Sequence, residues 1–195
     1  DVDNFVITAK DIRGPWSKPV YLHSAGFDAS MLHDDDGRKW VVSLEWETRE
    51  GYEKPGAICM VEYSPEKKEV IGYPKRIWNG GTDRGCIEAP HLTKRNGYYY
   101  IFAPAGGVQT GWQMEARSKN IYGPYEHKVV LHQGNSVING PHQGGWVDTE
   151  SGEDWFIHFQ DLNMYGRVTH LQPAKWVNDW LEIGVDNNKD NIGEP

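Results

Sequence analysis

The chain has 195 residues, of which 38% are hydrophobic and 25% charged, and its formal net charge is −8 at pH 7. This length suffices for one sizeable core and predicts a single domain. No apolar stretch approaches the roughly 18 residues that a membrane span needs. No basic stripe exists to neutralise phosphates, so we expect neither a membrane nor a nucleic-acid partner.

The two cysteines, Cys59 and Cys86, are too few for a disulfide framework or a metal knuckle. We predict that both are buried free thiols. The sequence shows no signal peptide, and we favour a secreted or periplasmic location over a cytoplasmic one. The chain begins at Asp1 inside a predicted strand and without an initiator Met, so we expect residues to precede it.

The first predicted elements, in residues 1–22, are similar in sequence to a later part of the chain. Residues 9–16 match residues 118–125 at an offset of 109 residues, including the Gly-Pro pairs at 14–15 and 123–124. The offset is about two periods of the repeat described next. We therefore interpret residues 1–22 as the closing half of one repeating unit.

After these residues a pattern returns three times. Asp28 begins the first copy, Glu88 the second and His142 the third, and each copy continues into a turn and then an aromatic-rich apolar run. The turn glycines at 37, 97 and 152 are spaced by 60 and 55 residues. A repeat of this length indicates a propeller or a solenoid.

Each copy is predicted to form four strands. The polar residue stands near the start of the first strand, and Asp36-Gly37 and Asn96-Gly97 are strong signals for the hairpin that follows. The second strand is the aromatic run, the third strands are predicted at residues 57–63, 113–117 and 166–170, and outer strands at about 75–78 and 128–131. Four strands in about 55 residues predict a propeller blade.

The fold class predicted is therefore an all-β propeller. Residues 1–22 would end the first blade, residues 23–80, 81–133 and 134–184 would form the next three, and residues 185–195 would be a connecting surface loop. The chain would supply about three and a half blades, so two wide apolar faces would be left open. We expect residues 1–195 alone to be poorly soluble and inactive.

The first strand of every blade lines the channel of a propeller, so Asp28, Glu88 and His142 are predicted to converge. Two carboxylates brought together disfavour each other's ionisation, and one can then keep a proton and serve as a general acid. Glycoside cleavage needs such an acid and a carboxylate that activates water. We interpret the Asp34–Asp36 run and residues 186–190 as solvated turns rather than calcium loops, and His33, His91 and His132 as structural.

Several motifs together resemble glycoside hydrolase family 43. GFDASMLHDDDG (26–37) resembles its second-blade motif, and IEAPHL (87–92) followed by NGYYY (96–100) resembles its general-acid segment. ARS (116–118) with GPY (123–125) is typical of its third blade. GPHQGG (140–145) and GRVTHLQP (166–173) are similar to the branch that contains β-xylosidases and α-L-arabinofuranosidases.

The resemblance implies a five-bladed propeller and an inverting mechanism that releases xylose or arabinose from xylan-derived or arabinose-containing saccharides. It implies that Glu88 is the general acid, that Asp28 orients it and tunes its pKa, and that Arg167 binds the sugar in the terminal subsite. His142 matches a histidine that often coordinates Ca²⁺, mostly through waters.

Other parts of the site are predicted less directly. Trp46 and Trp112 are predicted from their loop positions to stack on sugar rings, with core packing as the alternative for each. The family's catalytic base belongs to a first-blade strand that we do not find here, since Asp1, Asp3 and Asp11 are not in its motif. The missing blades would come from the same polypeptide or from a second chain.

Two other functions stay open on the sequence. A fructan-cleaving propeller hydrolase usually has Cys-Pro after its acid, whereas Ala89-Pro90 follows Glu88 here. A sugar-binding propeller without catalysis would explain the missing base. Joint retention of Asp28, Glu88 and Arg167 argues against that second alternative, because a binding protein needs no acid beside a tuning neighbour.

Overall fold

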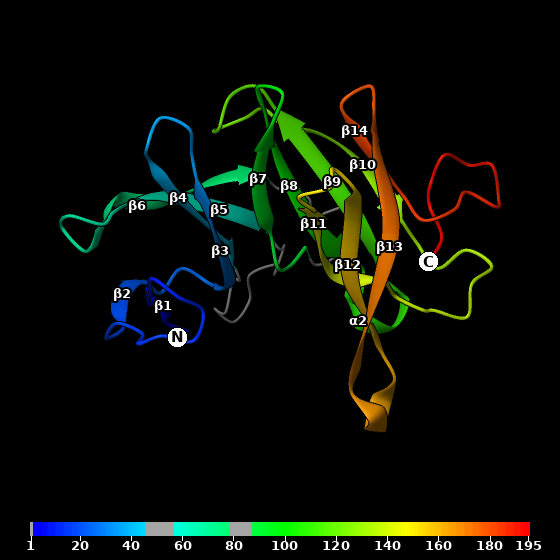
Figure 1. Cartoon of the computed structure of the whole chain (residues 1–195), viewed down its shortest axis with the longest axis horizontal. Helices are drawn as coiled ribbons and strands as arrows, with labels where there is room; N and C mark the ends of the chain where they lie inside the picture. Colours follow the sequence, from blue (N-terminus) through cyan, green and yellow to red (C-terminus); the bar gives the residue numbers. More distant parts are fainter. Residues whose placement is uncertain (1, 46–56, 79–86) are drawn as a thin grey trace, which may run out of the picture.

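The computed structural model describes residues 2–45, 57–78 and 87–195, and their regular structure is almost entirely β-strand (Figure 1). Within these residues the strands form one two-stranded sheet and three four-stranded sheets. In the part of the chain that is described, no helix has the length and apolar character to cross a membrane.

Each four-stranded sheet is an antiparallel meander whose spatial order follows the chain order. The N-terminal pair is β1 (Asn4–Val6) and β2 (Val20–His23). The first four-stranded sheet contains β3 (Phe27–His33), β4 (Lys39–Glu45), β5 (Ala57–Ser64) and β6 (Glu69–Trp78). The second contains β7 (His91–Arg95), β8 (Tyr98–Ala105), β9 (Trp112–Ser118) and β10 (Glu126–Leu131). The third contains β11 (His142–Asp148), β12 (Asp154–Asp161), β13 (Arg167–Val177) and β14 (Trp180–Ile183).

This arrangement is that of propeller blades, and the all-β fold predicted from the sequence is confirmed. The inner strands β3 and β7 lie side by side, and β11 packs against β8 and β9 (Figure 1). Two short elements interrupt the strands: α2 (Gly107–Thr110) follows β8, and the 3₁₀ turn η1 (Asn163–Tyr165) ends the β12–β13 hairpin.

The hairpin turns show where local sequence decides structure and where it does not. Asn96 and Gly97 both have positive φ and join β7 to β8 as a two-residue turn, as predicted. The predicted Asp36-Gly37 hairpin is instead a longer turn, because β3 and β4 end their pairing at His33 and Lys39. A further two-residue turn at 178–179, also with positive φ, starts β14, which the sequence did not predict.

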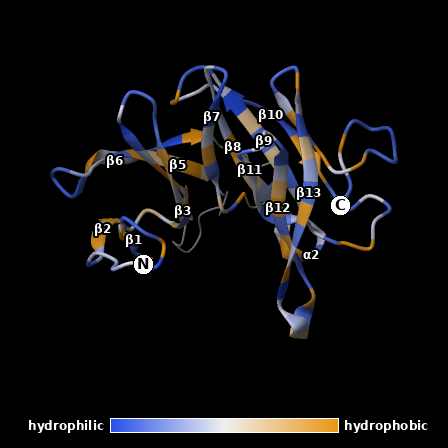
Figure 2. Cartoon of the chain, in the orientation of Figure 1, coloured by the Kyte–Doolittle hydropathy of each residue, from blue (hydrophilic) through white to orange (hydrophobic). Residues whose placement is uncertain are grey.

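The core lies between the sheets. The first and second four-stranded sheets are buried on both faces, whereas the third keeps exposed apolar side chains on one face. Trp40 and Val42 of β4 join a cluster with Ile101 and Met114 of the second sheet, whereas Val41 between them faces Leu22 of the N-terminal pair. A third cluster joins side chains of β8 to those of β12 and β14: Tyr100, Phe102, Val130, Leu131, Phe156, Leu181 and Ile183. Many apolar residues lie in the strands that form these clusters, and many of the loops are polar (Figure 2).

Asp34 corrects one expectation from the sequence. The Asp34–Asp36 run was interpreted as solvated, but the Asp34 side chain is 0% exposed and forms an ion pair of 2.5 Å with Lys94 of β7. Tyr99 Oη also donates a hydrogen bond of 2.8 Å to the Asp34 carboxylate. Burial alone raises the pKa of Asp34, but the hydrogen bonds from Lys94 and Tyr99 outweigh it and lower that pKa overall. The pair therefore joins two adjacent sheets.

We expect Asp34→Ala to lower the free energy of unfolding by about 2 kcal/mol, because it removes the buried partner of Lys94 at a sheet-to-sheet contact and leaves only the exposed Asp35. Urea unfolding of the full-length protein measures this. Asp36→Ala is the matched control, since the Asp36–Arg38 pair is exposed on both sides and its loss should change stability little. Equal effects of the two substitutions would contradict the structural role of Asp34.

Glu115 forms a second link between sheets. Its side chain is fully buried in β9, and its Oε2 accepts a hydrogen bond of 3.0 Å from the backbone N–H of Leu181 in β14. Burial raises the pKa of Glu115 to about 8, against a smaller opposing effect of the Leu181 N–H. The carboxyl group is therefore mostly protonated at neutral pH.

This pKa predicts a loss of stability toward alkaline pH. The folded pKa lies above the ordinary value of 4.5, so the folded protein keeps a proton that the unfolded chain releases between these two values. The free energy of unfolding should fall by up to roughly 1 kcal/mol per pH unit from pH ~5 to ~8. Glu115→Gln should flatten this slope in urea titrations, while Glu182→Gln, at an exposed site on β14, should preserve it. A slope unchanged by Glu115→Gln would refute the assignment.

Candidate active site

Each inner strand begins with the same irregularity, a β-bulge. The pairing register shifts between Phe27 and Ser30 in the first sheet and between His142 and Gly145 in the third. In the second sheet the pairing passes from Ile87 with Ala105 to His91 with Phe102, which also leaves one extra residue on the inner strand. A bulge of this kind bends the strand and re-aims nearby side chains.

The bulge residue itself has a left-handed backbone in all three sheets. The φ angles are +55° at Asp28, +39° at Ala89 and +46° at Gln143, although none is glycine. Such conformations are uncommon for non-glycine residues and are concentrated at functional sites. By this register Asp28 corresponds to Ala89 and Gln143, not to Glu88 and His142 as the sequence repeat predicts. The repeat is thus offset by one residue at Asp28.

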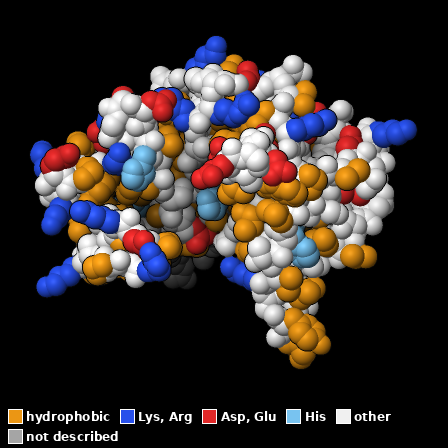
Figure 3. All heavy atoms as spheres, viewed as in Figure 1, with side chains coloured by type: hydrophobic (Ala, Val, Ile, Leu, Met, Phe, Trp, Pro, Cys, Tyr) orange, Lys and Arg blue, Asp and Glu red, His pale blue; other side chains and the backbone are white. Residues whose placement is uncertain are grey.

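The predicted residues nevertheless meet, because β3 is fastened directly to β7. Ser30 Oγ donates a hydrogen bond of 2.6 Å to the carbonyl of Pro90 and accepts one of 3.4 Å from the N–H of Leu92. On the other side, Gly144 N–H donates to Gln113 Oε1 at 2.9 Å and fixes β11 against β9. The three bulges therefore surround one hollow, in which acidic and histidine side chains can be seen (Figure 3).

Glu88 lies between two fixed groups. Its backbone N–H donates to the carbonyl of Pro104 at 3.1 Å, and its Oε2 stands 3.3 Å from Nε2 of His142. His142 is 0% exposed in its side chain and Glu88 22% exposed. The buried imidazole thus supports a carboxyl group that still reaches the hollow.

Asp28 is a carboxylate beside that carboxyl group. Burial raises its pKa, and the negative charge of Glu88 raises it further. A hydrogen bond from the backbone of Ala89 and the nearby charges of Arg167 and His142 act in the opposite direction. The predicted convergence of two acids and a histidine is therefore found in the structure, together with Arg167.

Arg167 reaches this group from the first position of β13. Its Nη1 donates a hydrogen bond of 3.3 Å to Gln143 Oε1, and its guanidinium carbon lies 4.6 Å from the centre of the Phe159 ring. The side chain is otherwise exposed. A guanidinium held on a ring face presents planar N–H donors to a ligand in the hollow.

The two tryptophans predicted to stack on sugars are placed differently. Trp46 lies outside the described residues. Trp112 is half-buried, packs against the first core cluster, and has ring atoms so close to Gly106 that a Cβ there would lie 2.5 Å away. The structure thus gives Trp112 the packing role that the sequence left as the alternative.

The residues around His142 do not form an inner calcium shell. Among the described residues, no three His, Cys, Asp or Glu side chains are grouped so that they could hold a metal ion. His142 Nε2 faces Glu88 and Nδ1 is buried without a hydrogen-bond partner, whereas Ca²⁺ takes six to eight oxygen ligands. Calcium held through waters at His142 stays a prediction.

Sequence reasoning missed two polar residues of the site. Gln143 links Asp28 and Arg167, and His91, which was interpreted as structural, lines a hollow of about 320 Å³ with Gln143 and Phe159. Burial lowers the pKa of His91, and the charge of Asp28 partly opposes this. The bulge explains why Gln143 and His91 were missed, because the extra residue changes which inner-strand side chains face the hollow. No sequence signal at Ala89 or Gln143 reveals a left-handed backbone.

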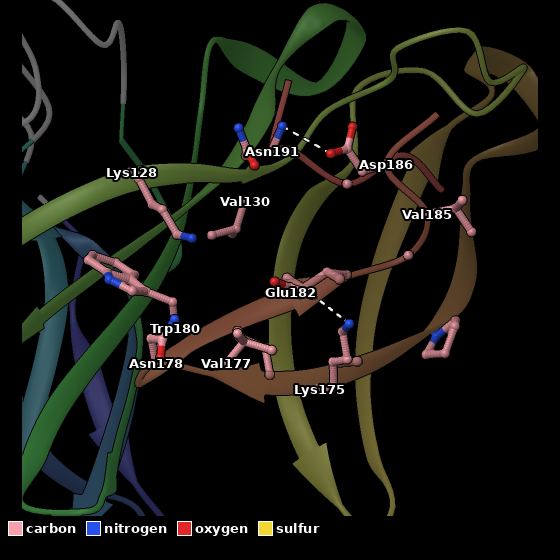
Figure 4. Close-up of a pocket in the computed structure, with 16 residues that line it drawn as sticks. Lys128, Val130, Lys175, Val177, Asn178, Trp180, Glu182, Val185, Asp186 and Asn191 are labelled. Atoms are coloured by element: carbon pink, nitrogen blue, oxygen red, sulfur yellow. Dashed lines mark hydrogen bonds and ion pairs between the residues drawn. The ribbon is translucent and has the colours of Figure 1, made fainter. Parts of the chain in front are cut away.

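A larger hollow of about 530 Å³ lies elsewhere, against β10, β14 and the C-terminal segment (Figure 4). Its polar groups bond one another: Lys175 pairs with Glu182 at 2.8 Å, and Asp186 accepts the backbone N–H groups of residues 190 and 191. Lys128 lies 4.9 Å from the Trp180 ring centre. These satisfied groups do not resemble a reaction centre.

The electrostatics of the site can be tested without a substrate. In Glu88→Gln we expect the pKa of Asp28 to fall, because the repelling charge is lost. Carboxyl-carbon NMR of the full-length protein over pH would follow Asp28 directly. Arg167→Gln should move the pKa of Asp28 upward. If neither substitution changes the titration of Asp28, then Glu88 and Arg167 do not interact with it in solution and the prediction is wrong.

Several known proteins are similar to this chain in sequence and fold. The family model described as "Glycosyl hydrolases family 43" matches residues 1–181. The chain is 38% identical over 200 residues to xylosidase/arabinosidase 43B of Humicola insolens, covering 94% of this chain and 37% of that protein. It is 34% identical to a beta-xylosidase of Bacillus subtilis, covering 92% of this chain and 38% of that protein.

A solved structure gives the same picture. Xylan beta-1,4-xylosidase from Bacillus halodurans C-125 superposes with a TM-score of 0.86 at 36% identity, covering 99% of this chain and 38% of that one. The chain thus spans well under half the length of the relatives that it matches.

Proposed function

Because this chain belongs to glycoside hydrolase family 43, we propose that the protein is an inverting glycosidase that releases xylose or arabinose from xylan-derived or arabinose-containing saccharides. The observation that supports this most is the meeting of Asp28 and Glu88 in one hollow beside Arg167. The named activities of the relatives, xylosidase and arabinosidase, agree with it.

Glu88 acts as the general acid in this proposal. The charge of Asp28 disfavours loss of a proton from a neighbouring carboxyl group, so Glu88 can hold its proton until a leaving oxygen takes it. The bond from the sugar carbon to that oxygen then breaks, while a water attacks the opposite face of the sugar. His142 positions the Glu88 carboxyl group from its buried side.

The base that activates this water would come from the part of the family's length that this chain does not span. Asp3 and Asp11 are unsuited to the task, because both are exposed on the N-terminal segment. Asp3 accepts a hydrogen bond from Ser24, and Asp11 pairs with Arg13 at 2.8 Å. Neither contact leads to the hollow around Glu88.

The partners follow from the same proposal. Arg167 would bind hydroxyl groups of the terminal sugar with its planar donors. On the third four-stranded sheet, Val147, Ile157 and Leu171 are each more than 40% exposed on neighbouring strands. We propose that a further propeller sheet, from the same polypeptide or a second chain, covers these side chains.

The acid assignment predicts a dependence on the leaving group. Glu88→Ala in the full-length protein should lower kcat/KM for xylobiose by roughly 10²–10⁴-fold, because the sugar leaving group needs a proton. The loss should be much smaller with nitrophenyl β-xyloside, because its leaving group departs as a stable nitrophenolate anion and does not need a proton. Initial rates on both substrates measure this difference.

The controls separate the alternatives. Glu150→Ala, at an exposed turn, should leave both rates unchanged. Nitrophenyl arabinofuranoside tests the arabinose reading, and sucrose tests the fructan-cleaving one. Hydrolysis of xylobiose that survives Glu88→Ala at full rate would remove the acid assignment, and no turnover of any glycoside by the wild type would favour a sugar-binding propeller.

A further inference from the structure

The bulge residues of three neighbouring sheets meet at one carboxylate. Asp28 is itself the bulge residue of β3, the backbone of Ala89 donates a hydrogen bond to it, and the Gln143 side chain donates another of 3.3 Å from Nε2. Ala89 and Gln143 are the corresponding residues of the next two sheets. Equivalent positions of the repeat therefore contact one another across the hollow.

The amide of Gln143 can satisfy both neighbours in only one orientation. Its NH₂ group faces the Asp28 carboxylate, which only accepts, and its oxygen faces the Arg167 guanidinium, which only donates. The reversed amide would oppose oxygen to oxygen and N–H to N–H. An uncharged side chain with one donor end and one acceptor end is thus suited to stand between a carboxylate and a guanidinium cation.

The backbone around Gln143 is held in place. Gln143 keeps a φ of +46°, His142 before it is fully buried, and Gly144 after it donates its N–H to Gln113. A Cβ on Gly144 would lie 2.2 Å from the Phe156 ring, so this close packing depends on glycine. The left-handed conformation of Gln143 is therefore imposed by its surroundings, and it directs the side chain toward Asp28 and Arg167.

We propose that Gln143 is a positioning residue that holds the Arg167 guanidinium at a fixed separation from the Asp28 carboxylate. The inference rests on the proposed glycosidase function and adds a residue to its site. Without this amide, the guanidinium would move toward the carboxylate and form a direct ion pair. That pair would turn N–H donors away from the sugar and would hold Asp28 more firmly in its charged form.

Two substitutions in the full-length protein separate these effects. Gln143→Ala removes both hydrogen bonds and should raise KM for xylobiose about tenfold, more than it lowers kcat, because Arg167 is no longer directed at the sugar. Gln143→Glu keeps the length and the acceptor for Arg167, so KM should stay within about threefold. Its added negative charge disfavours ionisation of the neighbouring acids and should move the alkaline limb of kcat/KM up by about half a pH unit or more.

The double variant tests whether Gln143 acts through Arg167. Once Arg167→Ala has raised KM, adding Gln143→Ala should raise it by less than about twofold, because both remove the same contact to the sugar. Gln109→Ala, on exposed α2, should leave KM and the pH profile unchanged. If Gln143→Ala does not fold, Gln143→Asn, which is too short to reach both partners, should show the same rise in KM.

The outcomes are distinct. A folded Gln143→Ala protein with wild-type KM, or a Gln143→Glu protein with an unmoved alkaline limb, would overturn the inference. Fully additive effects of the two substitutions on KM would overturn it as well. A wild-type protein that hydrolyses no pentoside would instead refute the proposed function.

Discussion

The site depends on one backbone feature, the extra residue at the start of each inner strand. A regular strand sends successive side chains to opposite faces, so it would turn either Asp28 or its neighbour away from the channel. The bulge breaks this alternation and lets the sheets direct polar groups into the hollow while their apolar residues stay in the core. A left-handed φ at a non-glycine residue costs on the order of 1 kcal/mol or more, and the packing around it sustains this cost.

Within this frame, charge decides how the groups behave. Asp28 is raised in pKa by burial and by Glu88, and is partly relieved by Arg167 and by the N–H of Ala89. Gln143 stands between the two opposite charges without adding a third. The arrangement keeps two acidic side chains and a guanidinium close together without a direct ion pair between Asp28 and Arg167 among the contacts of the described residues.

Sequence reasoning reached the architecture because its signals are local and repeated. Alternating apolar runs and turns such as Asn96-Gly97 predicted the meanders, and the period predicted that Asp28, Glu88 and His142 converge. It aligned Asp28 one residue off, since a bulge leaves no mark in composition. It also took Asp34 for a solvated residue, because its partner Lys94 lies 60 positions away in another sheet. Gln143 escaped notice for a related reason: its importance comes from two partners, 115 and 24 residues distant.

Burial of both faces of the first and second four-stranded sheets has a consequence for how the molecule unfolds. Trp40 and Val41 are neighbours in β4, yet each belongs to a different interface. If either of these two sheets detached, two apolar layers would become exposed to water at once, so neither blade should unfold while its neighbours stay folded. The hollow is made of pieces from all three four-stranded sheets, and it should vanish in the same cooperative step as the core.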